Sequence, residues 1–371
     1  MTQRFEPDER KDWLSLSLVP GLGPATFWNL VNNLGSPTEV LLAPTAVLQQ
    51  IPGVKPSIIE ALTQKSLIGE VAQAEMNRLQ KLDGHVITVD DSDYPVLLGK
   101  TAVPPPVLFV RGRKELLNRP SVAIVGSRAA TSYGRRTAFT LARNLAAKHV
   151  SVVSGLATGI DAEAHAGCLA EGGATIAVLG CGLDIVYPRS NRDLYNQVID
   201  QGVLISEYPL GTKPDGFRFP ARNRIIAGLS HGVVVVEAAR KSGSLITVQY
   251  ALEEGREVFA VPGQIDSAKS SGAHWLLQQG ASLIVSAEDI VDNLQLQLGQ
   301  LVQQAAHTRP HAAELDDESL TLLKLLDSYP ICRDELLERS GMEPAKISEI
   351  LLLLELEGLI ELLPGDELRR V

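Results

Sequence analysis

The chain has 371 residues, 45% of them hydrophobic, and a formal net charge of −10. This length predicts two or three domains with ample apolar content for a large core. The first residues are charged and lack the apolar segment of a secretory signal, and no apolar run reaches the roughly 18 residues of a membrane span. The three cysteines are far apart and indicate neither disulfides nor a metal site. We therefore expect a cytoplasmic protein.

The negative charge is concentrated near the C-terminal end. Residues 311–371 carry 6 Lys and Arg against 15 Asp and Glu, a net charge of −9. The remaining residues carry 28 against 29, a net charge of −1. The overall acidity therefore does not exclude a local basic site in residues 1–310.

Residues 1–82 are predicted to form a helical domain. The stretches "LVPGLGPATFWNLV" (18–31) and "QIPGVKPSIIEAL" (50–62) each combine a Pro-Gly turn with an amphipathic helix. They resemble the helix-hairpin-helix units of a SAM-like domain, in which N–H groups at a helix N-terminus hold a phosphate. The alternative is that the turns only stop and start helices of a bundle. Whether this domain contacts a nucleic acid is therefore left open.

Residues 83–292 alternate short apolar runs with helical segments. The runs are "HVITV" (85–89), "SVAIVG" (121–126), "VSVVSG" (150–155), "TIAVLG" (175–180), "VLISE" (203–207), "GVVVVEA" (232–238), "EVFAVPG" (257–263) and "SLIV" (282–285). Uniformly apolar strands separated by helices are typical of a parallel sheet covered on both faces. We predict an α/β fold, a Rossmann-like doubly wound, mostly parallel sheet. Its ligand should bind at the carboxyl ends of the strands.

Residues 293–315, rich in Gln and Ala, are predicted to be a linker. Residues 316–371 predict three helices, "DESLTLLKLLDS", "CRDELLERSG" and "EPAKISEILLLLELEG", and then a hairpin that turns at Pro364-Gly365. This order indicates a C-terminal winged-helix domain. Its recognition helix would be repelled by phosphates, because it carries Glu343, Glu349, Glu355 and Glu357. We therefore expect this domain to contact protein or to be purely structural.

The segments after the predicted strands carry two kinds of groups. Glycines and serines, as in "GSR" (126–128) and "KSGS" (241–244), let backbone N–H groups approach an anion. Cationic residues (Arg128, Arg189, Lys213, Arg218, Arg222, Arg224, Lys241) alternate with aromatic residues (Tyr187, Tyr208, Phe217, Phe219). Guanidinium groups bind phosphates and aromatic rings stack on bases. This combination suits a nucleic-acid strand.

Several polar residues of these loops have a structural alternative. Asp161 and His165 are candidates for a helix cap and its neighbour one turn later. Glu207 and Glu237 lie at strand ends, where a general base would act, but such carboxylates also bind loop N–H groups or arginines. The sequence contains no nucleophile elbow, zinc-protease motif or Walker A loop. We predict no catalytic residue, no metal and no cofactor.

In order along the chain, "VAIVGSR", "SGLATGIDAEAH", "GLDIVYPRSNRDL", "SEYPLGTKP", "FPARNRIIAGLS", "VVVVEAARKSGSLITVQYALEEGREVFAVPG" and "SSGAHWLLQQGA" resemble the DprA (Smf) family of DNA-processing proteins. The resemblance spans nearly all of residues 100–285. It implies a protein of natural transformation, active in competence, that binds and protects incoming single-stranded DNA. It also implies a homodimer that loads the recombinase RecA, with single-strand-binding protein as a further candidate partner.

The resemblance assigns DNA binding to the arginine of the GSR motif, here Arg128, and to the basic residue after the "YP" pair, here Arg189. The "FPARNR" and "KSGS" segments are expected to line the same pocket. With the small residues at the strand ends, the predicted DNA-binding residues are Gly126, Ser127, Arg128, Ser154, Gly155, Arg189, Asn191, Phe217, Phe219, Arg222, Asn223, Arg224, Lys241, Ser242, Gly243 and Ser244.

Two other functions compete with this one. A Rossmann-like nucleotide-processing enzyme, similar to phosphoribohydrolases, would carry a P-G-G-x-G-T run that this chain lacks. A regulator that reads duplex DNA through the C-terminal domain is disfavoured by the acidity of that domain. The dimer face is not evident from the motifs, and the apolar segment 273–285 near the predicted sheet edge is the best candidate.

Overall fold

The computed structural model describes residues 7–294 and, after these, residues 322, 326, 331–340, 342, 346–348, 350–351, 354, 360–363 and 367–370. The chain separates into two units, Met1–Gln303 and Gln304–Val371. In the described residues, no helix has the length and apolarity needed to cross a membrane. The predicted linker lies almost entirely outside these residues.

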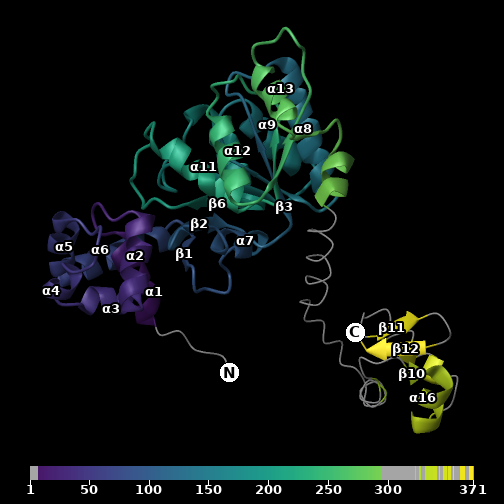
Figure 1. The fold of residues 1–371 in the computed structure, drawn as a ribbon, viewed down its shortest axis with the longest axis horizontal. Helices are drawn as coiled ribbons and strands as arrows, with labels where there is room; N and C mark the ends of the chain where they lie inside the picture. Colours follow the sequence, from purple (N-terminus) through teal and green to yellow (C-terminus); the bar gives the residue numbers. More distant parts are fainter. Residues whose placement is uncertain are drawn as a thin grey trace. The chain divides into compact units, whose positions relative to one another are not determined.

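The first unit begins with a group of helices, coloured purple to blue in Figure 1. They are α1 (Pro7–Ser17), α2 (Pro24–Leu34), α3 (Pro37–Leu42), α4 (Thr45–Leu48), α5 (Pro56–Thr63) and α6 (Lys65–Gln80). Proline occupies the start of α2, α3 and α5, where its missing N–H has no helical partner to lose. Trp13 stacks on Phe27 with ring centroids 5.5 Å apart, and both are buried. These two rings therefore belong to the core.

These helices share their hydrophobic core with the sheet. Leu14, Phe27 and Leu30 belong to the same cluster of buried residues as Phe109 and Leu204, which lie on strands. The Nε1–H of Trp28 also donates to the carbonyl of Pro104, at 2.8 Å. The helical region therefore packs directly on the α/β region, and a boundary between them at residue 82 stays a prediction.

A nine-stranded sheet follows, in the order β1-β2-β6-β5-β4-β3-β7-β8-β9. Its strands are β1 (Gly84–Thr88), β2 (Val107–Gly112), β3 (Ser121–Val125), β4 (Ser151–Ser154), β5 (Thr175–Leu179), β6 (Val203–Ser206), β7 (Gly232–Val235), β8 (Glu257–Ala260) and β9 (Ser282–Leu283). Strands β3 to β9 pair in parallel. The predicted mostly parallel sheet is confirmed. Strand β2 is not among the predicted apolar runs, and it pairs antiparallel with β1 and β6.

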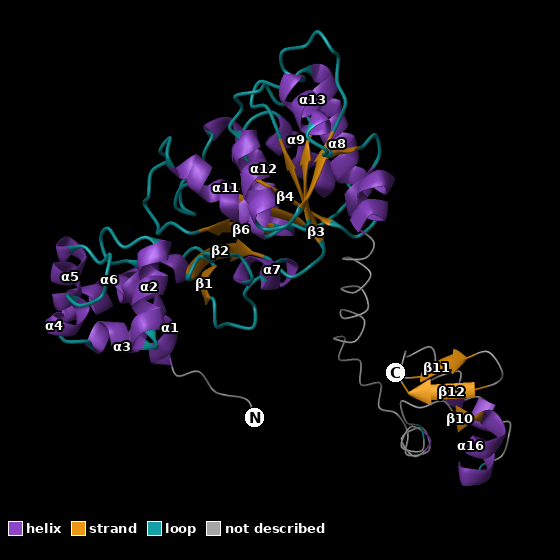
Figure 2. Ribbon diagram, viewed as in Figure 1, coloured by secondary structure: helices purple, strands orange, loops and turns teal. Residues whose placement is uncertain are grey.

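Helices cover both faces of this sheet, as the apolar strands predict (Figure 2). They are α7 (Val96–Gly99), α8 (Ser132–Ala147), α9 (Ile160–Ala170), α10 (Arg192–Gln201), α11 (Arg218–Gly228), α12 (Ser244–Glu253) and α13 (Ser271–Gln278), with 3-10 turns η1 (Lys114–Leu116) and η2 (Arg189–Asn191). Val122 and Ile124 of β3 pack with α8 and α9, whereas Ala123 and Val125 pack with α11 and α12. This alternation follows from the two-residue period of a strand.

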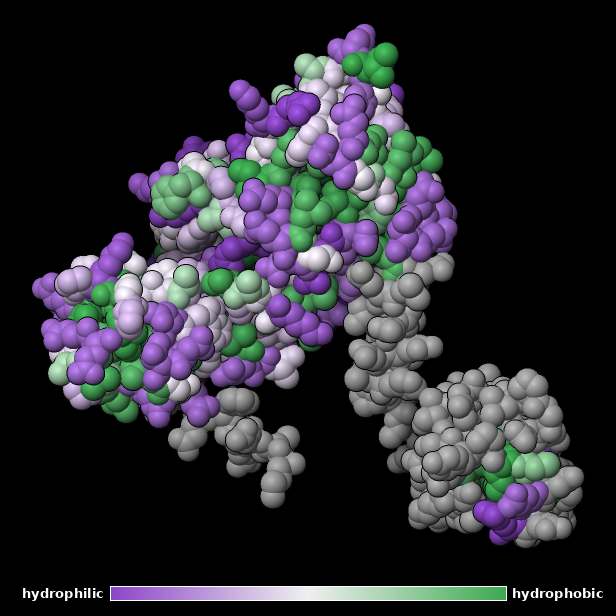
Figure 3. Space-filling view, in the orientation of Figure 1, coloured by the Kyte–Doolittle hydropathy of each residue, from purple (hydrophilic) through white to green (hydrophobic). Residues whose placement is uncertain are grey.

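Apolar side chains are also exposed on the surface of this unit. Figure 3 shows such patches between hydrophilic side chains. Among these side chains, Ile265 is 94% exposed, Val285 is 73% exposed and Leu283 is 56% exposed. The last two lie on or next to β9, at one edge of the sheet.

The second unit contains β10 (Ile331–Cys332), α16 (Arg333–Ser340), β11 (Ile360–Leu363) and β12 (Glu367–Arg370). Strands β11 and β12 pair antiparallel with Leu362 opposite Leu368, which agrees with the predicted hairpin, and α16 agrees with the predicted second helix. Residues 346–348, 350–351 and 354 of the predicted third helix are helical. Most of the predicted first helix and Glu343, Glu349, Glu355 and Glu357 lie outside the described residues.

Candidate functional site

A groove of about 750 Å³ lies at the carboxyl ends of the parallel strands. Its lining comes from the segments after β3, β4, β5, β6 and β7 and from α11 and the first turn of α12, which are far apart in the sequence. A narrower pocket of about 50 Å³ adjoins it and shares Arg128, Tyr187, Phe219 and Arg222. The structure therefore places a concave site where the sheet topology predicts one.

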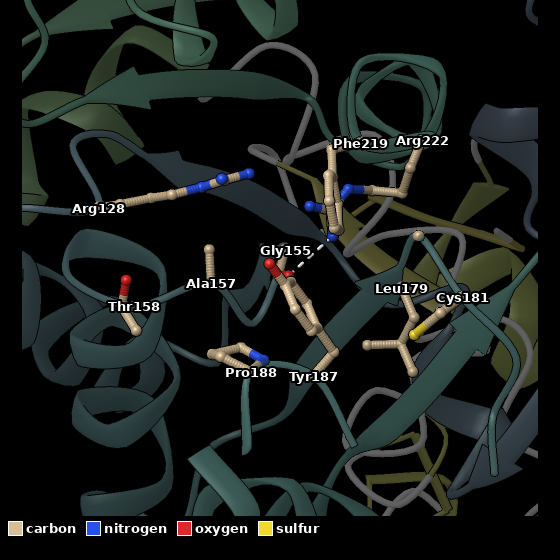
Figure 4. Close-up of a pocket in the computed structure, with 11 residues that line it drawn as sticks. Arg128, Gly155, Ala157, Thr158, Leu179, Cys181, Tyr187, Pro188, Phe219 and Arg222 are labelled. Carbon is tan, nitrogen blue, oxygen red and sulfur yellow. Dashed lines mark hydrogen bonds between the residues drawn. The ribbon is translucent and has the colours of Figure 1, made fainter. Parts of the chain in front are cut away.

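Arg128 and two aromatic rings meet in this groove. The guanidinium carbon of Arg128 lies 5.1 Å from the centroid of the Phe219 ring. The Phe219 ring stacks on Tyr187 with centroids 5.3 Å apart and an angle of 23° between the planes. Figure 4 shows the Arg128 side chain extending toward Phe219. The three side chains form a cation–aromatic platform that is open to the groove, since Tyr187 is 41% exposed.

A glycine lets the Phe219 ring lie close to the end of the sheet. A Cβ atom at Gly180, directly after β5, would lie 3.0 Å from Phe219. Phe219 itself lies in the first turn of α11. The ring is therefore carried by a helix and packs against the end of β5.

Arg222 lies beneath the groove and is only 4% exposed. Its guanidinium donates to the carbonyl oxygen of Gly155 at 2.8 Å and to that of Val178, and Figure 4 shows the first of these bonds. Burial lowers the pKa of this guanidinium to about 10. Both of these hydrogen bonds come from Nη1 and are directed at the ends of β4 and β5, while Nε has no partner among the described residues. Arg222 also lines the groove, so its contact with phosphate stays a prediction.

Asp161 accompanies this buried cation. Burial raises the pKa of its carboxyl, while the charge of Arg222 and the N–H groups of Ala157 and Gly155 lower it. Asp161 also lines the groove, in the first turn of α9. Both groups thus fix the loop between β4 and α9.

Glu237 holds the loop that carries Arg128. The Thr131 N–H and hydroxyl donate to its two carboxylate oxygens at 2.8 and 2.7 Å, and its backbone carbonyl accepts from Ser127 N–H at 2.7 Å. A Cβ atom at Gly134 would lie 2.8 Å from the Glu237 carboxylate. Glu237 therefore positions the loop by binding its N–H and hydroxyl groups, which is the structural role that the sequence allows for a carboxylate at a strand end.

The loop between β4 and α9 packs against the same segment. Gly159 has a φ of +81°, and a Cβ atom there would lie 2.3 Å from the carbonyl oxygen of Ser127. Asn191 donates to the carbonyls of Leu156 and Ala157 at 3.0 and 3.3 Å. Asn191 therefore supports the groove from outside rather than lining it.

The opposite wall is the N-terminal end of α12. Ser242, Gly243 and Ser244 line the groove there, and the two serine hydroxyls lie 2.8 Å apart. Asn223 donates to the carbonyl of Gly243 at 3.3 Å. A helix N-terminus with small residues is a favourable place for an anion.

The structure brings most of the predicted site residues together. The groove and the narrower pocket are lined by Gly126, Ser127, Arg128, Gly155, Phe219, Arg222, Asn223, Ser242, Gly243 and Ser244. They are not lined by Ser154, Arg189, Asn191, Phe217, Arg224 or Lys241. Ser154 is buried and donates to the carbonyl of Ile124, whereas Arg189, Phe217 and Lys241 are exposed.

Arg224 points to a different part of the molecule. Its guanidinium binds the carboxylate of Glu207 and donates to the carbonyl of Val103 at 3.0 Å. Burial raises the pKa of Glu207, and the charge of Arg224 opposes this rise. Glu207 therefore binds an arginine, which is the structural role that the sequence allows for it. The charges of Arg224 and Glu207 are paired with each other.

Tyr187 is the main residue of the groove that the predicted list omitted. In the sequence it stands only as one of the aromatic residues between the cations. Pro214, Asp215, Gly216 and Thr247 also line the groove. Pro214 and Thr247 lie in segments that resemble the family, but no property of these four side chains predicts a contact with DNA. In the described residues, no group of three His, Cys, Asp or Glu side chains is placed to hold a metal ion.

The fold and the site define a Rossmann-like α/β protein with a cation–aromatic groove at its strand ends and a second, C-terminal unit. Residues 85–295 match the family model of DNA recombination-mediator protein A, and residues 305–366 match the DprA winged helix domain. The chain belongs to the DprA family of DNA recombination mediators and carries its winged helix domain.

Relatives match along much of the chain. Protein Smf of Synechocystis is 36% identical over 400 aligned residues, which cover 98% of this chain and 99% of the relative. Protein Smf of Escherichia coli is 42% identical over 297 residues, which cover 78% and 79%. The DNA processing protein DprA of Streptococcus pneumoniae is 47% identical over 201 residues, which cover 54% and 71%.

Two solved structures are similar to this one. The DprA structure from Streptococcus pneumoniae has a TM-score of 0.67 and 36% identity, over 76% of this chain and 97% of that one. A DprA structure from Helicobacter pylori, described for its single-stranded DNA binding mode, has a TM-score of 0.52 and 31% identity. It covers 57% of this chain and 97% of its own.

Proposed function

We propose that this chain binds single-stranded DNA in the strand-end groove and acts as a mediator of recombination in natural transformation. The observation that carries this proposal is the stacking of Arg128, Phe219 and Tyr187 in one groove. Rings and guanidinium planes are the groups on which unpaired bases stack, whereas a duplex keeps its bases inside. The similarity to a protein described for its single-stranded DNA binding mode supports the same function.

The strand is held by two kinds of contact. Phosphates meet Arg128 and the N-terminal end of α12, and bases stack on Phe219 and Tyr187. Because Arg128 covers the Phe219 ring, a base that stacks on this ring displaces the guanidinium, which then becomes available to a phosphate. Neither contact distinguishes the four bases, so binding tolerates any sequence and weakens with salt.

The test is an anisotropy titration of labelled oligo-dT with Arg128→Ala. Loss of one phosphate contact lowers the steepness of log K against log salt by about 0.7, and the affinity falls together with it. Arg119→Ala is the matched control, because Arg119 lies two residues before β3, at the amino ends of the parallel strands and away from the groove. If Arg128→Ala binds oligo-dT as tightly as the unaltered protein, the groove is not the binding site.

We further propose that the protein forms a homodimer, protects the incoming strand and loads RecA onto it past single-strand-binding protein. The dimer proposal is supported by the edge strand β9, next to which Leu283 and Val285 are exposed, since an unpaired apolar edge favours association. Sedimentation of Leu283→Glu tests this face and predicts a monomer. A RecA strand-exchange assay on coated single-stranded DNA tests the loading.

A further inference from the structure

Helix α8 presents an exposed basic stripe that no part of the proposed groove uses. Tyr133, Arg136, Thr140 and Arg143 recur at spacings of three and four residues, so they lie on one side of the helix. Tyr133 is 46% exposed, and both arginines are exposed as well. We call these four residues the α8 stripe.

The two arginines of the stripe are not used in ion pairs of the described fold. Within residues 7–294 and the described part of the second unit, neither Arg136 nor Arg143 makes an ion pair. Neighbouring cations do: Arg135 pairs with Glu163 at 3.3 Å, and Lys148 pairs with Glu288 at 2.9 Å. The charge of the stripe is therefore available to a ligand.

Helix α8 carries only positive charge. Its sixteen residues include three arginines and no carboxylate, and Lys148 follows at its C-cap. Arg135 and Lys148 pair with carboxylates of other segments. The charge that remains on the helix is that of Arg136 and Arg143, and an anion bound along α8 would pair with it.

The stripe is continuous with the groove. Helix α8 starts at Ser132, three residues after Ala129, which lines the groove. The hydroxyl of Tyr133 donates to the carbonyl of Pro262 at 2.9 Å, which fixes the ring beside the entry of the helix. From Arg136 to Arg143 the helix rises by about 10 Å, so the two arginines can contact separate phosphates of one strand.

We propose that the α8 stripe holds the sugar-phosphate backbone of single-stranded DNA where the strand leaves the groove. Arg136 and Arg143 bind phosphates, and Tyr133 packs against the sugar or base nearest the groove. The proposal rests on the proposed function of the groove. It commits to one occupant, because the charge of the stripe is complementary to phosphate and because its first residues adjoin the groove.

The experiment compares two lengths of oligo-dT on the full chain. A strand of about 6 nucleotides fills the groove alone, and one of about 24 nucleotides extends beyond it. Arg136→Ala with Arg143→Ala is expected to weaken binding of the long strand by about 10- to 30-fold near 0.1 M salt and to lower its salt slope by about 1.4. Binding of the short strand is expected to stay unchanged.

The control is Arg113→Ala with Arg119→Ala, which removes the same charge at the end of the sheet where the parallel strands begin and should change neither affinity. Arg113 differs from the stripe arginines in that it forms an exposed ion pair with Glu115. If the α8 variant binds both lengths as tightly as the unaltered protein, the proposal for the α8 stripe is wrong. It is also wrong if the variant loses the same affinity for both lengths. If Arg128→Ala still weakens both lengths in that case, the proposed function of the groove stands. If the unaltered protein binds neither length, the proposed function itself fails.

Discussion

The guanidinium of Arg128 lies over the ring of Phe219, 5.1 Å from its centroid. The two residues are 91 positions apart in the chain, on the β3–α8 loop and in the first turn of α11. Parallel strands bring these segments together, because every strand of β3 to β9 ends at the same edge. A cation and a ring that are unremarkable alone thus form one binding surface.

Phe219→Ala should weaken binding of oligo-dT by about 1–3 kcal/mol, because the base that stacks on the ring loses its platform. Fluorescence anisotropy at one salt concentration measures the change. Phe219→Trp keeps an aromatic face and should retain most of the affinity. Tight binding by the alanine variant would show that the bases do not use this ring.

Arg222→Met should lower the free energy of unfolding by about 3–5 kcal/mol, because it leaves Asp161 buried without its cation and two strand-end carbonyls without a donor. Urea denaturation followed by circular dichroism measures the loss. Lys114→Met, at an exposed ion pair, is the control and should cost less than about 1 kcal/mol. A stable Arg222→Met protein with weakened DNA binding would instead show that Arg222 contacts DNA.

Arg224→Ala should destabilise the fold while leaving the affinity for oligo-dT unchanged. The substitution leaves the half-buried Glu207 carboxylate unpaired, which costs roughly 1–3 kcal/mol. Denaturation and anisotropy on the same preparation separate the two effects. The opposite pattern, normal stability with lost affinity, would make Arg224 a DNA ligand after all.

Gly159→Ala should be more damaging than Gly172→Ala, although both glycines have positive φ angles, +81° and +67°. A Cβ atom at Gly159 would lie 2.3 Å from the Ser127 carbonyl oxygen, whereas nothing lies within 4 Å of one at Gly172. Gly159 also has a ψ of −126°, outside the left-handed helical region that other residues occasionally adopt, so the backbone strain of Gly159→Ala adds to the clash. The excess loss of stability in Gly159→Ala, measured by thermal unfolding, therefore reports the backbone conformation and the packing of the two loops together. Equal losses would mean that these loops move apart without cost.

Acid should destabilise the protein partly through His165. Burial and the charge of Arg222 lower the pKa of this imidazole to about 3, below its value of about 6.5 in an unfolded chain. Between these values the unfolded state binds a proton that the folded state does not. Stability therefore falls as the pH drops from about 6.5 toward 3, by about 1.4 kcal/mol per pH unit from this group.

His165→Gln should remove that part of the pH dependence. Urea denaturation of both proteins between about pH 7 and pH 4 measures the difference in slope. His231 also has a pKa lowered by burial, so a residual slope is expected in the variant. Identical slopes in both proteins would show that His165 takes up its proton in the folded state.

The sequence by itself determined the parallel sheet and the place of the site. Runs such as "SVAIVG" and "GVVVVEA" are apolar on both faces, and this local pattern has few structural solutions other than a covered parallel strand. The site then follows from topology, because ligands bind at the carboxyl ends of such strands. Strand β2 is not among the predicted strands. It is antiparallel to its neighbours, and only its pairing with β1 and β6 shows that it belongs to the sheet.

Only the tertiary structure decided which side chains of the site face the groove. Arg222 and Arg224 lie two residues apart on α11, so they project in nearly opposite directions around the helix. One is bound to the ends of β4 and β5 and the other to Glu207. The spacing along a helix predicts that the two side chains point in different directions. The residues that each side chain contacts lie on strands and loops distant in the sequence, so the spacing does not predict them. The contacts of Phe219 with Arg128 and Tyr187 could not be predicted either, because the three residues lie on segments distant in the sequence.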